Sequence, residues 1–340
     1  MTRKWAMRVP DSSQPRWLYA ILLPFVFSYS FAIAELDTEP SGNAAEVPHV
    51  VFVAGDHEYR SEEILPMLAD MMRKHFGFRV SVCYPLDGEG RVDPLLETSI
   101  SGLEALEDAD LMVMYTRFRR LPQDQLERIS RYVESGRPVA GFRTSTHAFR
   151  FEGPELAEWN NDWPKRTFGQ HWITHHGHFD DGRVPLTRVR SAADVEGHPV
   201  LRGISGFDSY SWLYHVQGSF QNREWALDEG CVVLVTGEAL RSNQPEDVPR
   251  ENPVVWIREA DEEEKRGRLF FTTLGHPFDF RDPMMVNLSL QGFLWAMGHG
   301  DSIPESGLGL EPPADFSPNP SGMSRENIKL GLEPRFLFHP

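Results

Sequence analysis

The chain has 340 residues, of which 40% are hydrophobic and 25% are charged, and its formal net charge is −16. That apolar content excludes a wholly disordered chain, and the length suits one large domain or one domain with long insertions. The excess of Asp and Glu argues against a nucleic acid as partner, because contacts to phosphates require Lys and Arg.

Residues 1–34 have the three-part pattern of a secretory signal peptide. Four basic residues come first, and an apolar run over 17–34 then ends in the small-x-small sequence Ala-Ile-Ala. This pattern predicts cleavage before Glu35 and export to the periplasm or out of the cell. An uncleaved membrane anchor is the alternative, because the run is long for a signal core, but Pro24 makes it a poor span. After processing we therefore expect no stable membrane span.

A polar linker with Pro and Gly is expected at 35–47, and an alternation of strands and helices follows it. The expected strands are 49–54, 78–84, 111–115 and 138–142, and the expected helices are 61–75 and 122–135. Apolar strands that alternate with helical segments are typical of βαβ units and a parallel sheet. In such a sheet the site lies at the carboxyl ends of the strands.

The second half of the chain has weaker periodicity. Residues of about 150–225 are rich in Trp, His, Asn and Gly, which indicates a long insertion or a cap over the strand ends. Further strands are expected at 186–191, 231–235, 254–258 and 268–273, and a closing helix at 284–297. The remaining residues, 299–340, form a Pro- and Gly-rich C-terminal tail.

Six segments of the chain together resemble one known family in their order and spacing. They are GDHEYRSEE (55–63), DLMVMYTRFRRLP (110–122), GRPVAGFRTSTHAF (136–149), FGQHWITHHG (168–177), HPVLRGI (198–204) and NPVVW to GRLFFTTLGHP (252–277). Over about 48–298 the chain resembles the ThuA-like (trehalose utilisation) family. This resemblance implies an α/β fold with a doubly wound, mostly parallel sheet, flavodoxin-like and similar to class I glutamine amidotransferases, here with a His/Trp-rich insertion. It implies a small, sugar-like ligand and no defined reaction.

The loop at 143–147 falls where amidotransferases carry a nucleophilic Cys. This loop has none, and Cys83 and Cys231 lie in apolar, strand-like runs. We therefore expect no glutamine hydrolysis, and two buried thiols rather than a disulfide. Ser145 would serve as a nucleophile only with a base in reach. The alternative is that the loop hydroxyls cap a helix and fix the turn.

A base could come from His276, which is followed three residues later by Asp279. The segment resembles the His-Pro-Glu ending of amidotransferases, although there the acid follows after two residues. A triad of Ser145, His276 and Asp279 is conceivable, with the acid holding the imidazole tautomer. His147, in the loop after the fourth strand, is a further catalytic candidate. The alternative is that His276 lines a sugar or metal site.

Four histidines are concentrated between 171 and 178. His176 and His178 would share one face of a strand, and neutral imidazole suits transition metals. Asp56, His57 and Glu58 could complete such a divalent metal site. The alternative is a polar, substrate-facing loop with no metal, so the cofactor stays undetermined.

Residues that follow the expected strands, together with one residue of the insertion, are the candidates for substrate binding. They are Asp56, His57, Glu58, Arg117, Arg143 and Trp172. Arg binds carboxylates or sugar hydroxyls, but pairing with nearby acids is an equal alternative. For the aromatic residues, a small satellite core is the alternative. Three hypotheses follow: an exported enzyme acting on a small carbohydrate derivative, a non-catalytic carbohydrate-binding protein, and an interaction protein. The sequence leaves the oligomeric state open.

Overall fold

The computed structural model describes residues 47–338 except 178, 180–182, 194 and 196. The expected signal peptide and nearly all of the expected linker lie outside these residues. Within the described ranges, no helix is long and apolar enough to cross a membrane.

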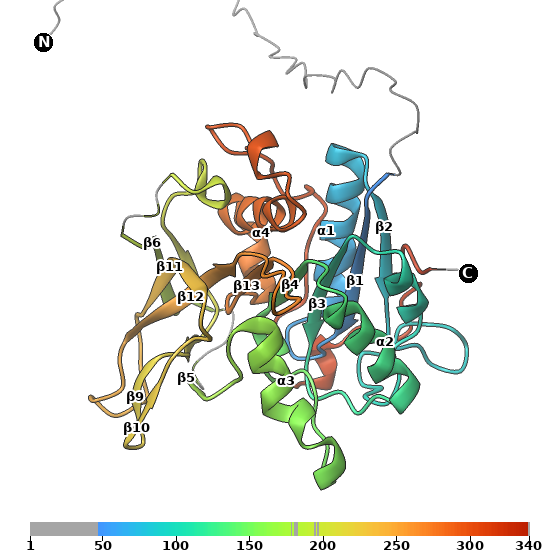
Figure 1. The fold of residues 1–340 in the computed structure, drawn as a ribbon, viewed down its shortest axis with the longest axis horizontal. Coiled ribbons are helices and arrows are strands. Elements are labelled where there is room, and N and C mark those ends of the chain that lie inside the picture. Colours follow the sequence, from blue (N-terminus) through green and yellow to red (C-terminus); the bar gives the residue numbers. More distant parts are fainter. Residues whose placement is uncertain (1–46, 178, 180–182, 194, 196, 339–340) are drawn as a thin grey trace, which may run out of the picture. The chain divides into compact units, whose positions relative to one another are not determined.

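The central sheet has nine strands in the order β2-β1-β3-β4-β13-β12-β11-β6-β7 (Figure 1). The first five pair in parallel: β2 (Arg79–Cys83), β1 (His49–Gly55), β3 (Leu111–Thr116), β4 (Val139–Phe142) and β13 (Leu269–Thr272). The other four extend the sheet with antiparallel pairings: β12 (Glu251–Arg258), β11 (Cys231–Ala239), β6 (Thr187–Ser191) and β7 (Phe207–Ser209). The α/β class is confirmed, and the parallel part is joined to an antiparallel part that the strand-helix alternation did not predict.

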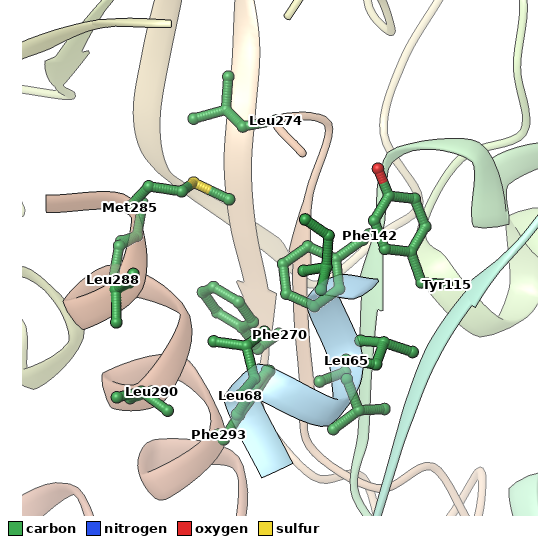
Figure 2. Close-up of a cluster of buried hydrophobic side chains, with 14 of the residues drawn as sticks. Leu65, Leu68, Tyr115, Phe142, Phe270, Leu274, Met285, Leu288, Leu290 and Phe293 are labelled. Atoms are coloured by element: carbon green, nitrogen blue, oxygen red, sulfur yellow. The ribbon is translucent and has the colours of Figure 1, made fainter. Parts of the chain in front are cut away.

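Helices cover both faces of the parallel part. The longer helices are α1 (Ser61–Phe76), α2 (Gln123–Glu134), α3 (Glu158–Phe168) and α4 (Pro283–Ala296). One hydrophobic cluster joins α1 and α4 to the sheet, and a second cluster contains the buried residues of α2 and α3. In Figure 2, Leu65 of α1 and Phe293 of α4 lie beside Phe142 and Phe270 of the sheet. The sheet is therefore wound on both sides, as a parallel sheet with buried strands requires.

Short 3-10 helices make many of the remaining turns. They are η1 (Leu103–Glu107), η2 (Arg143–His147), η3 (Pro154–Leu156), η4 (Pro199–Leu201), η5 (Pro277–Arg281), η6 (Gly300–Ser302) and η7 (Arg325–Asn327). Because η2 begins directly after β4, it forms the strand-to-helix turn expected at 143–147.

The segment expected as an insertion is only partly separate from the sheet. Its strands β6 and β7 join the antiparallel edge, and α3 packs on one sheet face. The rest forms two small antiparallel pairs: β5 (Thr174–His176) with β8 (Leu213–His215), and β9 (Gly218–Phe220) with β10 (Arg223–Trp225).

The C-terminal segment, residues 299–338, runs back to the beginning of the domain (red in Figure 1). The amide of Val82 donates to the carbonyl of Phe336 at 2.9 Å, and the amide of Val92 donates to that of Leu332 at 2.9 Å. These bonds hold the end of the chain beside β2.

Cys83 is buried, Cys231 is half-buried, and neither is in a disulfide. Two buried thiols were expected; this is right for Cys83, whereas Cys231 is only half-buried.

Candidate functional site

The site lies at the carboxyl ends of β1, β3 and β4. From β1 the chain passes through α1 to β2 on one side, and then returns to β3 on the other side of β1. The loops that follow neighbouring strands diverge at such a point and leave a crevice. A cavity of about 580 Å³ is found there. Its lining consists of Glu58, Tyr59, Arg117, Phe118, His147, Trp172, Thr174, His175, Trp212, Tyr214, Gln244, Gly322 and Met323.

The loop after β1 is held by the carboxylate of Asp56. This buried group accepts hydrogen bonds from the amides of Glu58 at 2.7 Å and Tyr59 at 3.1 Å, and from the hydroxyl of Thr144. His57 is also buried, and its Nδ1 lies 3.0 Å from Nη2 of Arg119. Asp56 and His57 were candidates for ligand binding, but they do not line the cavity. They shape the loop so that Glu58 and Tyr59 do.

The loop after β3 places an ion pair in the cavity wall. Nε of Arg117 lies 2.7 Å from Oε2 of Glu58, and both side chains are largely buried. The Arg117 guanidinium also lies over the ring of Phe118, 4.3 Å from its centroid. Arg117 is therefore paired with a nearby acid, which was the alternative to a role in ligand binding. The cavity wall carries both a carboxylate and a guanidinium.

The turn after β4 begins with a residue in a strained backbone conformation. Arg143 itself has φ +39°, in the left-handed region that non-glycine residues rarely adopt. Its buried guanidinium donates to the carbonyls of Thr273 at 2.8 Å and Trp212 at 3.1 Å. Arg143 therefore does not line the cavity but ties the elbow to two other segments beneath it.

Ser145 has a structural partner on each side. Its Oγ donates to the carbonyl of Met114 at 2.9 Å and accepts from the amide of Thr116 at 3.2 Å. The side chain is fully buried. The hydroxyl thus binds the elbow to β3, as the alternative reading of these hydroxyls proposed.

His147 is the catalytic candidate that does reach the cavity. Its ring lies 5.0 Å from that of Phe118, 5.6 Å from that of Trp172 and 6.3 Å from that of Tyr214, measured between centroids. Burial, with the positive charges of Arg117 and Arg143 adding to it, holds the pKa of His147 well below its usual value. The imidazole is therefore neutral near pH 7, and a neutral imidazole accepts a hydrogen bond or a proton.

His276 and Asp279 form a capping box instead of a catalytic pair. The Asp279 carboxylate accepts from the amide of His276 at 3.0 Å and from the hydroxyls of Ser209 at 2.9 Å and Ser211 at 2.6 Å. Nδ1 of His276 accepts from the amide of Phe278 at 3.1 Å. Asp279 therefore contacts the backbone of His276 and not its ring, so it does not set the tautomer as a triad acid would.

Residues 170–215 supply the wall above the strand ends. Pairing of β5 with β8 sets His175 opposite Tyr214, and the His175 ring lies 4.8 Å from that of Trp212. Trp172, a candidate for substrate binding, lines the cavity with 37% of its surface exposed.

Of the two histidines considered for a metal, His176 has both ring nitrogens close to other partners. Nδ1 of His176 lies 2.6 Å from the hydroxyl of Ser242, and Nε2 lies 3.0 Å from the carbonyl of Pro249. His178 lies outside the described residues. Among the described residues, no group of three or more His, Cys, Asp or Glu side chains is placed to hold a metal ion.

Sequence reasoning did not select several lining residues as ligand contacts. Tyr59 directly follows the chosen Glu58 in the loop after β1, and that adjacency was the available signal. Gly322 and Met323 had no signal, because they lie in the tail, far along the chain from every other lining residue.

Comparisons with known proteins place the chain in one family. Residues 50–296 match the family model described as ThuA, trehalose utilisation. A ThuA-like protein from Bacteroides uniformis has a similar structure, with TM-score 0.47 and 15% identity, over 75% of this chain and 94% of that one. Another, from Parabacteroides merdae, has TM-score 0.47 and 15% identity over 86% of this chain and 100% of that one. Among curated proteins, none matches the sequence.

Proposed function

This chain belongs to the ThuA (trehalose utilisation) family, and we propose that it binds, and is placed to act on, a small carbohydrate derivative in the cavity at the strand ends. One observation carries the proposal: the cavity of about 580 Å³ combines five aromatic rings with charged and amide groups. Ligand sites of this size typically join an apolar lining to a few polar groups that fix orientation.

A sugar ring suits such a lining because it has two kinds of surface. Its C–H faces are apolar and can pack against Trp172, Trp212 or Tyr214, while its hydroxyls need hydrogen-bonding partners. Glu58 and Arg117 offer an acceptor and a donor from the same wall. The family's name supports the same class of ligand.

His147 is the residue we assign to any proton transfer. It lines the cavity, and because burial lowers its pKa the imidazole is neutral at pH 7 and free to accept a proton, although the same shift makes it a weak base. The elbow hydroxyl of Ser145 is engaged by β3, so we assign no nucleophile and no covalent intermediate. A catalytic role therefore means acid-base chemistry on a bound sugar.

A non-catalytic carbohydrate-binding protein is the second candidate. It is favoured by the turn at 143–147, which contains no Cys and in which the strained Arg143 is buried. For the fold, the parallel strand order β2-β1-β3-β4-β13 supports a flavodoxin-like, amidotransferase-like ancestry. We also propose that the protein is exported after cleavage at Glu35, a proposal that rests on the N-terminal sequence pattern.

Calorimetric titration of the purified protein with trehalose, glucose and a panel of other mono- and disaccharides tests the proposal. Trp172→Ala should weaken binding at least tenfold. Trp225→Ala should leave it unchanged, because Trp225 packs against His171 and does not line the cavity. NMR of the bound sugars over a day separates the two candidates. New signals that His147→Gln abolishes indicate an enzyme, unchanged sugars indicate a binding protein, and no binding at all overturns the proposal.

A further inference from the structure

The C-terminal segment supplies part of the cavity wall, although it lies beyond residues 50–296, which the family model matches. The amide of Gly322 donates to the carbonyl of Glu58 at 2.8 Å. From the other side, Nη2 of Arg60 donates to the carbonyl of Gly322 at 2.9 Å. Gly322 is thus held on the same loop that places Glu58 and Tyr59 in the cavity.

The attachment is reinforced on both sides of this point. Arg60 is fully buried and also donates to the carbonyl of His57, so its guanidinium joins the β1 loop to the tail. Further along the tail, Nζ of Lys329 pairs with Oε2 of Glu63 on α1 at 2.5 Å. Met323 directly follows the first of these anchors and therefore has a defined place beside the cavity.

Met323 presents an apolar side chain to solvent at that place. It is 55% exposed, and its sulfur lies 3.9 Å from Nη1 of Arg117. Trp172, the other strongly exposed apolar residue of the lining, is 37% exposed. Because lining residues are solvent-exposed only where a cavity opens, these two side chains mark its opening. Their exposed apolar area is removed from water when an apolar group of a ligand covers it.

We propose that Met323 is a specificity-determining residue, and that the ligand is a sugar carrying an apolar substituent that packs at the opening. This inference rests on the proposed function and refines it. The polar interior, with Glu58, Arg117 and His147, receives the sugar ring. The opening, at Met323 and the exposed part of Trp172, receives the substituent, as in a glycoside with an apolar aglycone. A thioether adapts to differently shaped apolar groups, so Met suits this position.

Matched methyl and phenyl glycosides of glucose, galactose and mannose test the inference by calorimetric titration. The wild-type protein should bind the phenyl glycoside of its sugar about tenfold more tightly than the methyl glycoside. Met323→Ser should reduce that ratio to about twofold while leaving the affinity for the methyl glycoside within about twofold. Leu330→Ser is the control, since Leu330 is a similarly exposed tail residue that does not line the cavity.

The outcomes are distinguishable. If glycosides bind but the phenyl-to-methyl ratio is the same in wild type and Met323→Ser, the inference on Met323 is overturned and the carbohydrate proposal stands. If no glycoside or free sugar binds, both fail together. Because Met323 is exposed, its substitution should not alter the melting temperature, and an unchanged melting temperature assigns any lost preference to the contact itself.

Discussion

The guanidinium of Arg143 lies over the ring of Tyr59, 4.3 Å from its centroid, and donates a hydrogen bond to the Tyr59 hydroxyl at 3.0 Å. The same guanidinium lies 4.6 Å from the ring centroid of Tyr214. Both tyrosines line the cavity and Arg143 does not. A buried cation close to two rings therefore helps to position two ligand-facing side chains that come from distant parts of the chain.

Replacing Arg143 should destabilise the protein. Arg143→Ala removes hydrogen bonds to two buried carbonyls and to Tyr59, so we expect a loss on the order of 3 kcal/mol in the free energy of unfolding. Arg188→Ala, which breaks an exposed ion pair with Asp208, should cost less than about 1 kcal/mol. Urea denaturation measures both. Equal, small effects would show that the Arg143 bonds contribute little.

The protein should lose stability in mild acid because of His147. Burial depresses its pKa in the folded state below the usual 6.5, so the unfolded chain binds more protons below that pH. The contribution of neutral His147 to the free energy of unfolding is therefore fully present above about pH 6.5. It decreases as the pH drops toward the pKa of the folded state. His147→Gln should flatten the decline in urea midpoint between pH 7 and pH 5. His75→Gln, at an exposed position on α1, should leave the decline unchanged, and a His147 variant with the wild-type slope would refute this assignment.

The carboxyl of Glu62 should lower the stability of the protein at high pH, whereas His147 lowers it in acid. Its carboxyl is buried with no hydrogen-bond partner for either oxygen among the described residues, and burial raises its pKa to about 8. The folded state therefore favours the protonated acid. This contribution is complete below the ordinary pKa of 4.5 and is lost as the pH rises through 8.

Glu62→Gln should consequently gain stability relative to wild type at pH 9 and differ little from it at pH 5. The measurement is the difference in unfolding free energy at the two pH values. Glu63→Gln is the matched neighbour, and it should lose stability at both, because it breaks the pair with Lys329. A Glu62 variant with no pH-dependent difference would mean that the carboxyl is solvated in solution.

Glutamine should not be hydrolysed. The elbow carries no Cys, burial raises the pKa of Cys231 to about 11, and burial also raises that of Cys83. Neither thiol is thus a ready nucleophile. An ammonia-release assay should give the same background for wild type, Cys83→Ala and Cys231→Ala. Release that one of these substitutions abolishes would place a nucleophile where we assign a buried thiol.

Export should leave Glu35 as the mature N-terminus. The charged start, apolar run and small-x-small end of residues 1–34 predict this cleavage. N-terminal sequencing of protein expressed with its own leader decides the point, and substitution of Ala34 by Arg should block processing. Intact Met1 in a membrane fraction of the unsubstituted protein would instead support an anchor.

The sequence by itself determined the parallel part of the fold and three of the residues that line the cavity. Buried parallel strands need continuous apolar runs, so 49–54 and 111–115 were recognisable as β1 and β3. Because the loops after such strands meet at one edge, we expected His57, Arg117, His147 and His276 to share a cleft. Arg117 and His147 line the cavity, as does the candidate Glu58, whereas His57 and His276 do not.

Only the tertiary structure decided which neighbouring residue faces the ligand and what closes the cavity. Asp56 turns into hydrogen bonds with its own loop, whereas Glu58 lines the cavity, a choice between nearby polar side chains that local sequence does not encode. Tyr214 enters through the β5–β8 pairing and Met323 through the tail. Such contacts join residues far apart in the chain, and their energies depend on burial and partners that exist only once the chain has folded.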